Sequence, residues 1–401
     1  MFFKKIIVSI LALAALAAGR ISAYDIPFPY SRIAAIPAAN PVQMPVDSND
    51  VELIADGPRM FESLLEDIAS AKVCINMECY KLLDDETGRM VRDAIVAKAR
   101  EGVKVRLIVE NVTHFTQNKA FYEDMRDAGV HVLYATDMYQ PLELVLKGIN
   151  NREHRKTIII DDRIVSTGGM NLTVRYYYDW ADVHLRVVGP VAASYARLFY
   201  DYWHFLGGEL PPRVDVPEAA GDVTVQPVNG GPGLSYIPDG IIKALDNAQD
   251  YIWFQTGYFS PSEELLEALG RAAARGVDVR LLISERVDFR VADYLNEFWL
   301  KKALDMGVRV FLYQPCFNHS KTIVCDDVFC AVGSANLVMR SLYVNYENFT
   351  FIYGREFSLK VKDLHLEREK DCRELTLDET RRWSLWHRFL QRAANIIHPL
   401  M

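Results

Sequence analysis

The sequence of 401 residues has little cysteine, no excess of positive charge and no long apolar run after its first residues. The six cysteines show no CxxC spacing, so we expect no zinc site. A formal net charge of −8 argues against the basic surface that nucleic-acid binding needs, and therefore against a nuclease. No segment beyond the N-terminus approaches ~18 continuous apolar residues, the length that spans a bilayer. Half of the residues are hydrophobic, which excludes a disordered or fibrous chain.

The N-terminus carries an apolar run. It reads MFFKK followed by IIVSILALAALAAG, and this pattern predicts a signal peptide over residues 1–23, with an uncleaved anchor as the alternative. Both place the body of the protein in the cell envelope, on the periplasmic side of the inner membrane. Residues 24–50 are rich in Pro and Ala and predict an extended tether. In an exported protein Cys325 and Cys330 could form a disulfide, although free thiols are the favoured expectation.

A pattern of His, Lys two residues later and Asp five residues after that occurs twice. The copies lie in NREHRKTIIIDDRIVSTGGMN, residues 151–171, and in NHSKTIVCDDVFCAVGSAN, residues 318–336. They share one register, since 319 − 154 = 165, and this register continues beyond the motif. The candidate residues are His154, Lys156, Asp161, Asn171 and Asp182 in the first copy, and His319, Lys321, Asp326, Asn336 and Glu347 in the second. The repeat indicates two copies of one structural unit.

Each copy is preceded by a strand, helix, Gly, strand pattern. It covers residues 73–80, 87–101 and 103–109 in the first half, and residues 251–254, 262–275 and 277–283 in the second. This is a βαβ unit, so the fold class is α/β with a mixed sheet flanked by helices. We expect a first lobe over residues 51–206, a Gly- and Pro-rich linker over 207–233 and a second lobe over 234–401.

The spacing within each motif suits work on a phosphate. Side chains two apart on a strand share a face, so each His points the same way as its Lys. The motif Asp lies too far along the strand to reach that His, and we assign Asp161 and Asp326 to the hairpin turns. Asp182 and Glu347 are better placed to orient the imidazoles, and the two Asn to hold phosphate oxygens. One imidazole can attack phosphorus while the other protonates the leaving alkoxide, so the copies should face each other across one cleft, with no metal or cofactor required.

The motifs resemble those of the phospholipase D superfamily, whose mark is a paired HxKxxxxD. Within it the chain is similar to the bacterial cardiolipin synthase branch, through the segments WADVHLRVVGP, TGYFSPSEELLEALGRAAARGVDVRLLI and GSANLVMRSLYVNYE. The resemblance implies a pseudo-two-fold pair of lobes and a phosphatidyl-histidine intermediate, with the two motif histidines as nucleophile and general acid. We assign His154 as nucleophile and His319 as general acid, and the reverse order stays open because the motifs are symmetric. The resemblance also implies phosphatidylglycerol as the phospholipid substrate, at a membrane surface, and it counts Asp161 and Asp326 among the catalytic residues.

Other interpretations stay open at this point. Water could replace the lipid acceptor, which would make the protein a phospholipase D, and a non-catalytic lipid-binding module is the alternative of another class. Residues 139–149 could form a lipid-accepting wall or an ordinary packing helix. The aromatic residues at 176–180 favour core packing over an interface. A helix over 380–397 would carry Trp383, Trp386 and Phe389 on one face, which we interpret as a docking face.

Overall fold

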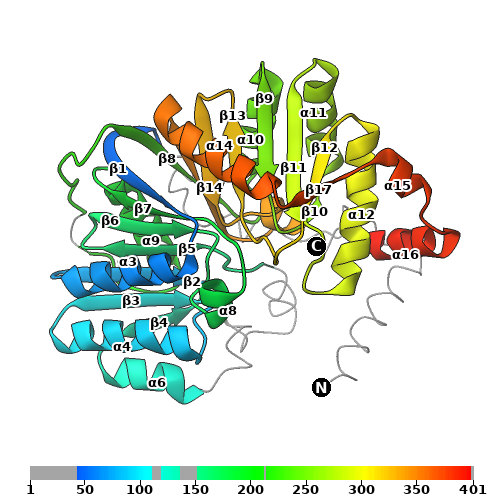
Figure 1. Ribbon diagram of the computed structural model, residues 1–401. Coiled ribbons are helices and arrows are strands. Elements are labelled where there is room, and N and C mark those ends of the chain that lie inside the picture. Colours follow the sequence, from blue (N-terminus) through cyan, green and yellow to red (C-terminus); the bar gives the residue numbers. More distant parts are fainter. Residues whose placement is uncertain (1–42, 111–118, 136–150, 212–213, 399–401) are drawn as a thin grey trace. The chain divides into compact units, whose positions relative to one another are not determined.

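The computed structural model describes residues 43–110, 119–135, 151–211 and 214–398, all within one compact unit, Ile36–Met401 (Figure 1). The predicted signal peptide or anchor, most of the predicted tether and the stretch 139–149 lie outside the described residues. None of the helices within the described ranges has the length and apolar content needed to cross a bilayer.

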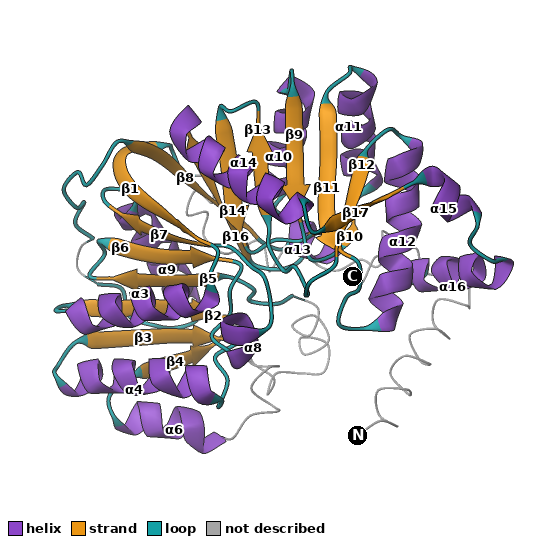
Figure 2. Cartoon of the chain, viewed as in Figure 1, coloured by secondary structure: helices purple, strands orange, loops and turns teal. Residues whose placement is uncertain are grey.

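Strands from both halves of the chain form one sheet, and helices flank it (Figure 2). The first-half strands are β1 Val46–Ile54, β2 Cys74–Cys79, β3 Lys104–Val109, β4 His131–Tyr134, β5 Lys156–Ile160, β6 Ile164–Gly168 and β7 His184–Val188. The second-half strands are β8 Val223–Gly230, β9 Tyr251–Gln255, β11 Asp278–Ser284, β12 Arg309–Tyr313, β13 Thr322–Cys325, β14 Phe329–Gly333, β16 Glu347–Tyr353 and β17 Cys372–Leu375. A separate parallel pair joins β10 Phe259–Ser260 to β15 Leu337–Val338.

The helices follow the same division. The first half has α3 Gly57–Ser70, α4 Glu86–Arg100, α6 Lys119–Asp127, α8 Val174–Tyr178 and α9 Ala192–Phe205. The second half has α10 Tyr236–Asn247, α11 Glu263–Ala274, α12 Arg290–Asp305, α13 Met339–Tyr343, α14 Arg355–Glu369, α15 Leu377–Arg381 and α16 Leu385–Asn395.

The strand order shows the duplication directly. It runs β1-β7-β6-β5-β2-β3-β4 in one half and β8-β16-β14-β13-β9-β11-β12 in the other, with β17 added at the far edge. The two halves meet where β1 pairs antiparallel with β8. In each half three parallel strands follow the motif strand, β2, β3 and β4 after β5, and β9, β11 and β12 after β13. The predicted α/β fold of two related lobes is confirmed.

Three large apolar cores hold the layers together. One lies between the first-half strands and α3, α4 and α6, and a second between the second-half strands and α10, α11 and α12. The third contains residues of both halves, together with α9 and α14. Ile159 and Val324 occupy matching places in this shared core, because the motif strands point one face toward it in each half. The two lobes are therefore fixed to each other by apolar burial as well as by strand pairing.

The predicted helices begin and end close to where the sequence signals place them. Asp56 accepts a hydrogen bond from the Arg59 N–H at the start of α3, and Asp85 accepts one from the Gly88 N–H at the start of α4. Such caps satisfy N–H groups that lack a partner in the first turn.

The structure differs from the sequence prediction in three segments. The predicted linker contains β8, because Val223, Thr224 and Val225 alternate as a strand and pair with β16 despite the flanking Gly and Pro. Strand β1 begins at Val46, inside the predicted tether. The single helix predicted over 380–397 is two helices, since the Ser384 hydroxyl accepts from the His387 N–H and starts α16 anew.

Candidate active site

Backbone bridges between the halves place each motif histidine against the opposite lobe. Glu153 pairs with Tyr346, and Asn318 pairs with Ala181. The His154 N–H donates to the Tyr346 carbonyl at 2.9 Å, and the His319 N–H donates to the Ala181 carbonyl at 2.7 Å. Both bridges obey the 165-residue register, so the contact is a pseudo-two-fold one.

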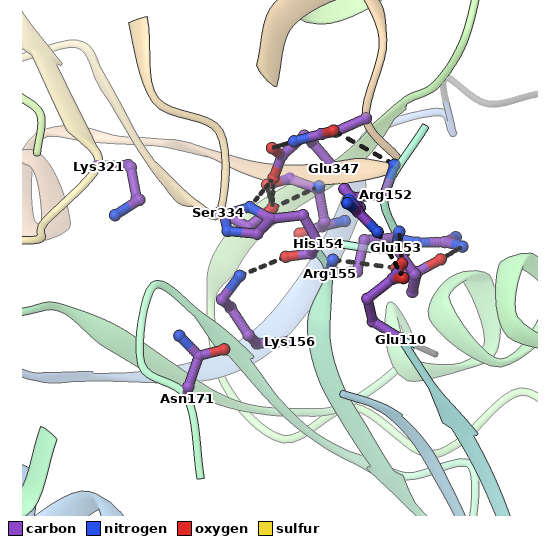
Figure 3. Close-up of polar contacts among 12 residues, drawn as sticks. Glu110, Arg152, Glu153, His154, Arg155, Lys156, Asn171, Lys321, Ser334 and Glu347 are labelled. Carbon is purple, nitrogen blue, oxygen red and sulfur yellow. Dashed lines mark hydrogen bonds and ion pairs between the residues drawn. The ribbon is translucent and has the colours of Figure 1, made fainter. Parts of the chain in front are cut away.

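These bridges set up a reciprocal pair of histidine–carboxylate contacts. His154 Nδ1 lies 2.8 Å from Glu347 Oε2, and His319 Nδ1 lies 2.7 Å from Asp182 Oδ2. Figure 3 shows the first of these contacts, with Glu347 reaching His154 from the other half. Because each carboxylate occupies Nδ1, Nε2 is the nitrogen left for the reaction. The predicted orienting role of Asp182 and Glu347 has this geometry, and each acts on the histidine of the other copy.

The two motif lysines are buried beside their histidines. Lys156 Nζ donates to the His154 carbonyl at 2.5 Å, and Lys321 Nζ donates to the His319 carbonyl. Burial lowers the pKa of Lys156 to about 7 and that of Lys321 to about 8, partly offset by Glu347 and Asp182. An anionic phosphate bound between them would raise both pKa values again, because it favours the charged form.

The two asparagines are also buried at the site, and each has an unpaired amide oxygen. Among the described residues no donor reaches Asn171 Oδ1 or Asn336 Oδ1. Asn171 Nδ2 donates to the Tyr176 hydroxyl at 2.6 Å. If the amide is turned over, Tyr176 donates to Oδ1 and Nδ2 is released for a phosphate oxygen, since a hydroxyl can donate or accept. Turned over in this way, the Asn171 amide would have a donor free for an anionic ligand.

The motif aspartates do not join the site. Asp161 accepts from the N–H groups of residues 72, 73 and 74, and Asp326 accepts from those of residues 249, 250 and 251. Each stands at the hairpin turn at the other end of its motif strand, in the left-handed region, with φ of 51° and 50°. The assignment to the turns is confirmed, and the resemblance-based inclusion of Asp161 and Asp326 among the catalytic residues is corrected. Seven residues of extended chain, at ~3.3 Å each, separate each aspartate from its motif histidine by roughly 23 Å along the strand.

Several site residues were not in the predicted set, because they are not repeated between the copies. The Tyr80 ring lies 4.5 Å from the His154 ring, and the Tyr176 and Trp180 rings lie 5.4 and 5.5 Å from the His319 ring. The Ser334 hydroxyl donates to Glu347 at 2.5 Å, where the first copy has Gly169. Aromatic density at 176–180 was the one signal for them, and Tyr176 is indeed buried while Tyr178 is exposed.

Burial and neighbouring charges give the two histidine–carboxylate pairs different pKa values. Burial lowers the pKa of His154 to about 4, against the effect of Glu347. Burial alone would raise the pKa of Glu347, but His154, Lys156 and the Ser334 hydroxyl lower it to about 2. Burial raises the pKa of Asp182 to about 6, only partly offset by Lys321. Burial, with Lys321 and Lys156, lowers the pKa of His319 well below its usual value.

Neither a disulfide nor a cluster of metal ligands occurs among the described residues. All six cysteines are free. Cys325 and Cys330 stand on neighbouring strands but belong to cores on opposite faces of the sheet, which separates their sulfur atoms. In the described parts of the chain no group of three or more His, Cys, Asp or Glu side chains is placed to hold a metal ion.

Two imidazoles, two lysines and two carboxylates from duplicated lobes, gathered at one buried site, define a phosphodiester-transfer enzyme of two-lobed α/β fold. Comparison with known proteins gives the family. The family described as "Cardiolipin synthase, PLD-like domain" matches residues 64–203 and 241–366. The chain belongs to this branch of the phospholipase D superfamily.

Named relatives agree with this assignment, and a solved structure shares the fold. The chain is 32% identical over 369 residues to the major cardiolipin synthase ClsA of Bacillus subtilis, covering 88% of this chain and 76% of that protein. It is 30% identical over 365 residues to cardiolipin synthase 2 of Bacillus anthracis, covering 88% and 71%. The fold is similar to that of phosphatidylserine synthase from Haemophilus influenzae, with a TM-score of 0.70 at 16% identity over 88% of this chain and 95% of that one.

Proposed function

We propose that the protein joins two phosphatidylglycerols into cardiolipin and releases glycerol. The observation that carries this proposal is the reciprocal contact of each motif histidine with the carboxylate of the other half. It provides two independently held imidazoles at one site, as a two-step exchange of phosphodiesters requires. The cardiolipin synthases among the relatives supply the lipid class.

The reaction proceeds through two displacements at phosphorus. His154 Nε2 attacks the donor phosphorus, the bond from phosphorus to the glycerol oxygen breaks, and His319 gives its proton to the departing glycerol. The hydroxyl of the second phosphatidylglycerol then loses its proton to His319 and attacks, and the bond from phosphorus to His154 breaks. Lys156, Lys321 and the two asparagines hold the phosphate oxygens through both steps, because charge develops there. No other reactant is needed.

The different proton affinities of the two pairs support this order of roles. Burial raises the pKa of the Asp182 carboxyl to about 6, so this carboxyl can hold a proton against His319 Nδ1 and leave the proton on Nε2. Against the effect of burial, His154, Lys156 and the Ser334 hydroxyl lower the pKa of Glu347 to about 2, so Glu347 stays charged beside a neutral His154. A general acid needs the proton and a nucleophile needs a free lone pair, so the asymmetry favours His319 as acid and His154 as nucleophile.

We also propose that the enzyme works at a membrane surface, in the cell envelope on the periplasmic side of the inner membrane. The N-terminal sequence pattern supports the location. On α16, Leu385, Trp386 and Phe389 are 84%, 66% and 56% exposed, so Trp386 and Phe389 do not dock against the described part of the chain as the sequence predicted. From Thr380 to the last residue the chain has four arginines and no Asp or Glu, which suits anionic lipid.

Flotation with vesicles tests the surface. Trp386→Ser with Phe389→Ser should reduce binding to phosphatidylglycerol vesicles, while Val328→Ser, which changes an exposed residue on the β13–β14 turn, should not. Equal flotation of all three proteins would remove α16 from the proposal.

A product assay tests the function itself. Purified protein is incubated with phosphatidylglycerol vesicles, and lipids and glycerol are quantified. Cardiolipin and glycerol in equal amounts are expected. Phosphatidic acid as the sole lipid product would make the protein a phospholipase D, and no turnover at all would leave a lipid-binding module.

A further inference from the structure

Lys81 is a cation beside the active site to which the proposed reaction has so far given no role. It follows Tyr80 at the end of β2, and its carbonyl accepts from the Leu172 N–H at 3.0 Å, next to Asn171. Its ammonium lies 5.2 Å from the centre of the Tyr80 ring. Lys156 Nζ lies 5.0 Å from the centre of the same ring, whose centre is 4.5 Å from that of the His154 ring. Lys81 is therefore separated from the reacting groups by a single aromatic side chain.

The ammonium of Lys81 is partly buried. Among the described residues it forms no ion pair and no side-chain hydrogen bond, and it lies over the Tyr80 ring. Burial lowers its pKa, partly offset by Asp288, and Arg175 acts in the same direction as burial. Asp288 itself accepts from the Tyr258 hydroxyl at 2.5 Å. Partial burial of a charged ammonium destabilises the protein, and an anion bound beside the ammonium would offset that cost.

The other half has no equivalent of this lysine. Glu78 pairs with Thr157 on β5, as Gln255 pairs with Thr322 on β13, which places Lys81 opposite Tyr258 in the repeat. The site thus has a cation on one side where the other side has a phenol. Such a difference can distinguish two substrates that bind on the two sides.

The two lipids differ in what remains on them as they react. The donor presents the phosphate that is attacked, and Lys156 and Lys321 serve it. The acceptor presents a hydroxyl and keeps its own phosphodiester, one glycerol unit from the reacting phosphorus. That second phosphodiester must also lose part of its hydration when it binds at this site. The two histidines, two lysines and two carboxylates already act on the first phosphate or on each other.

Lys81 lies on the appropriate side for the acceptor. Its carbonyl accepts from the Leu172 N–H, and the amide of the preceding residue, Asn171, donates to the Tyr176 hydroxyl, which lies 3.4 Å from His319 Nδ1. The charge of Lys81 accordingly lowers the pKa of His319. In successive displacements the acceptor enters where glycerol left, and His319 is the group that serves that position. We propose that Lys81 binds the phosphodiester of the acceptor lipid and so selects an anionic acceptor over water and neutral alcohols. This inference rests on the proposed function.

A partition experiment tests it with the full-length protein. Phosphatidylglycerol vesicles are supplied together with ethanol, so that each phosphatidyl group is recovered as cardiolipin, phosphatidylethanol or phosphatidic acid. Lys81→Met should lower the ratio of cardiolipin to phosphatidylethanol by about tenfold, the usual effect of losing one charge-assisted hydrogen bond. Lys81→Arg should restore most of the ratio. Lys104→Met, which removes an exposed charge at the other end of the first-half sheet, should leave it unchanged.

The ratio does not depend on how much enzyme is folded. An unchanged ratio in Lys81→Met would overturn the inference, even if all products fell together, because Lys81 would then act on the donor or on the fold. A wild-type protein that forms no cardiolipin would instead refute the proposed function, so the two failures are distinguishable.

Discussion

The two motif histidines make the same contact with a carboxylate, but the buried polar residues behind them differ. On the His154 side Arg155 binds Glu153 through two hydrogen bonds, of 2.9 and 2.6 Å, and lies 3.2 Å from Glu78. On the His319 side the matching positions are Ser320, Asn318 and Gln255, which carry no charge. Arg368 of α14 bonds to all three, and its other amine donates to the Asp182 carbonyl at 3.1 Å.

The difference shows which parts of a duplicated site must stay the same. Groups facing the phosphate keep their identity and register in both halves. Groups behind them need only satisfy one another, and either an ion pair or an arginine among amides does so. Because the supports carry different charge, the two imidazoles experience different electrostatics, and a symmetric motif can perform asymmetric roles.

Removing the carboxylates should have the largest effect on activity. Glu347→Gln and Asp182→Asn each keep the size of the side chain but remove the charge that orients and stabilises the imidazole of the other half. We expect kcat to fall by about 10⁴-fold in each, in line with loss of the carboxylate behind a catalytic histidine. Steady-state assays measure this. A loss below tenfold in both variants would show that the cross-half contacts are not functional.

Substituting the arginine behind each histidine should lower the stability of the protein by different amounts. Arg155→Met leaves buried Glu153 without its cation, and we expect a loss of about 3–5 kcal/mol in the free energy of unfolding. Arg368→Met leaves only neutral partners, and about 1–3 kcal/mol is expected. Urea unfolding at neutral pH gives both values. Equal losses would mean that the charge difference behind the histidines has no energetic consequence.

Substituting the small residue next to each carboxylate should show how strongly kcat depends on the position of that carboxylate. A Cβ at Gly169 would lie 2.1 Å from Asp182 Oδ1, so Gly169→Ser should displace that carboxylate and reduce kcat by about 10²-fold. Ser334→Gly removes the hydroxyl that donates to Glu347 and accepts from the Asn348 N–H, and a loss of kcat of about tenfold is expected. The same substitutions with reversed magnitudes would contradict the assigned geometry.

The motif aspartates should give the smallest effect on catalysis. Asp161→Asn and Asp326→Asn weaken three backbone hydrogen bonds at each turn, so we expect about 1–3 kcal/mol less stability in each half. The kcat of the folded protein should stay within about twofold. Thermal unfolding and active-site titration separate the two quantities, and a large loss of kcat in a fully folded Asp161→Asn would return that residue to the catalytic set.

Much of this arrangement could be predicted from the sequence, because agreement between the two copies of the motif supports each assignment. The motif residues, the βαβ units and the turn role of Asp161 and Asp326 follow from spacing alone. The cross-half partners do not, since contacts such as His154 with Glu347 depend on how two lobes pack. Strand β8 was missed because its partners lie far along the chain, and the start of α16 because a single serine cap interrupts a continuous helical pattern. Lys81, Tyr176 and Ser334 were missed because they occur in one copy only.

The assignment of roles to the two histidines is the central claim, and a phosphatidyl ester of p-nitrophenol tests it directly. Its leaving group departs without a general acid, so the first displacement no longer needs His319. His319→Asn should release about one equivalent of nitrophenol in a burst and accumulate protein with the phosphatidyl group on His154, found by mass spectrometry after rapid quenching. His154→Asn should show no burst. A burst in His154→Asn with the label on His319, or a label on neither histidine in the wild-type protein, would contradict the account.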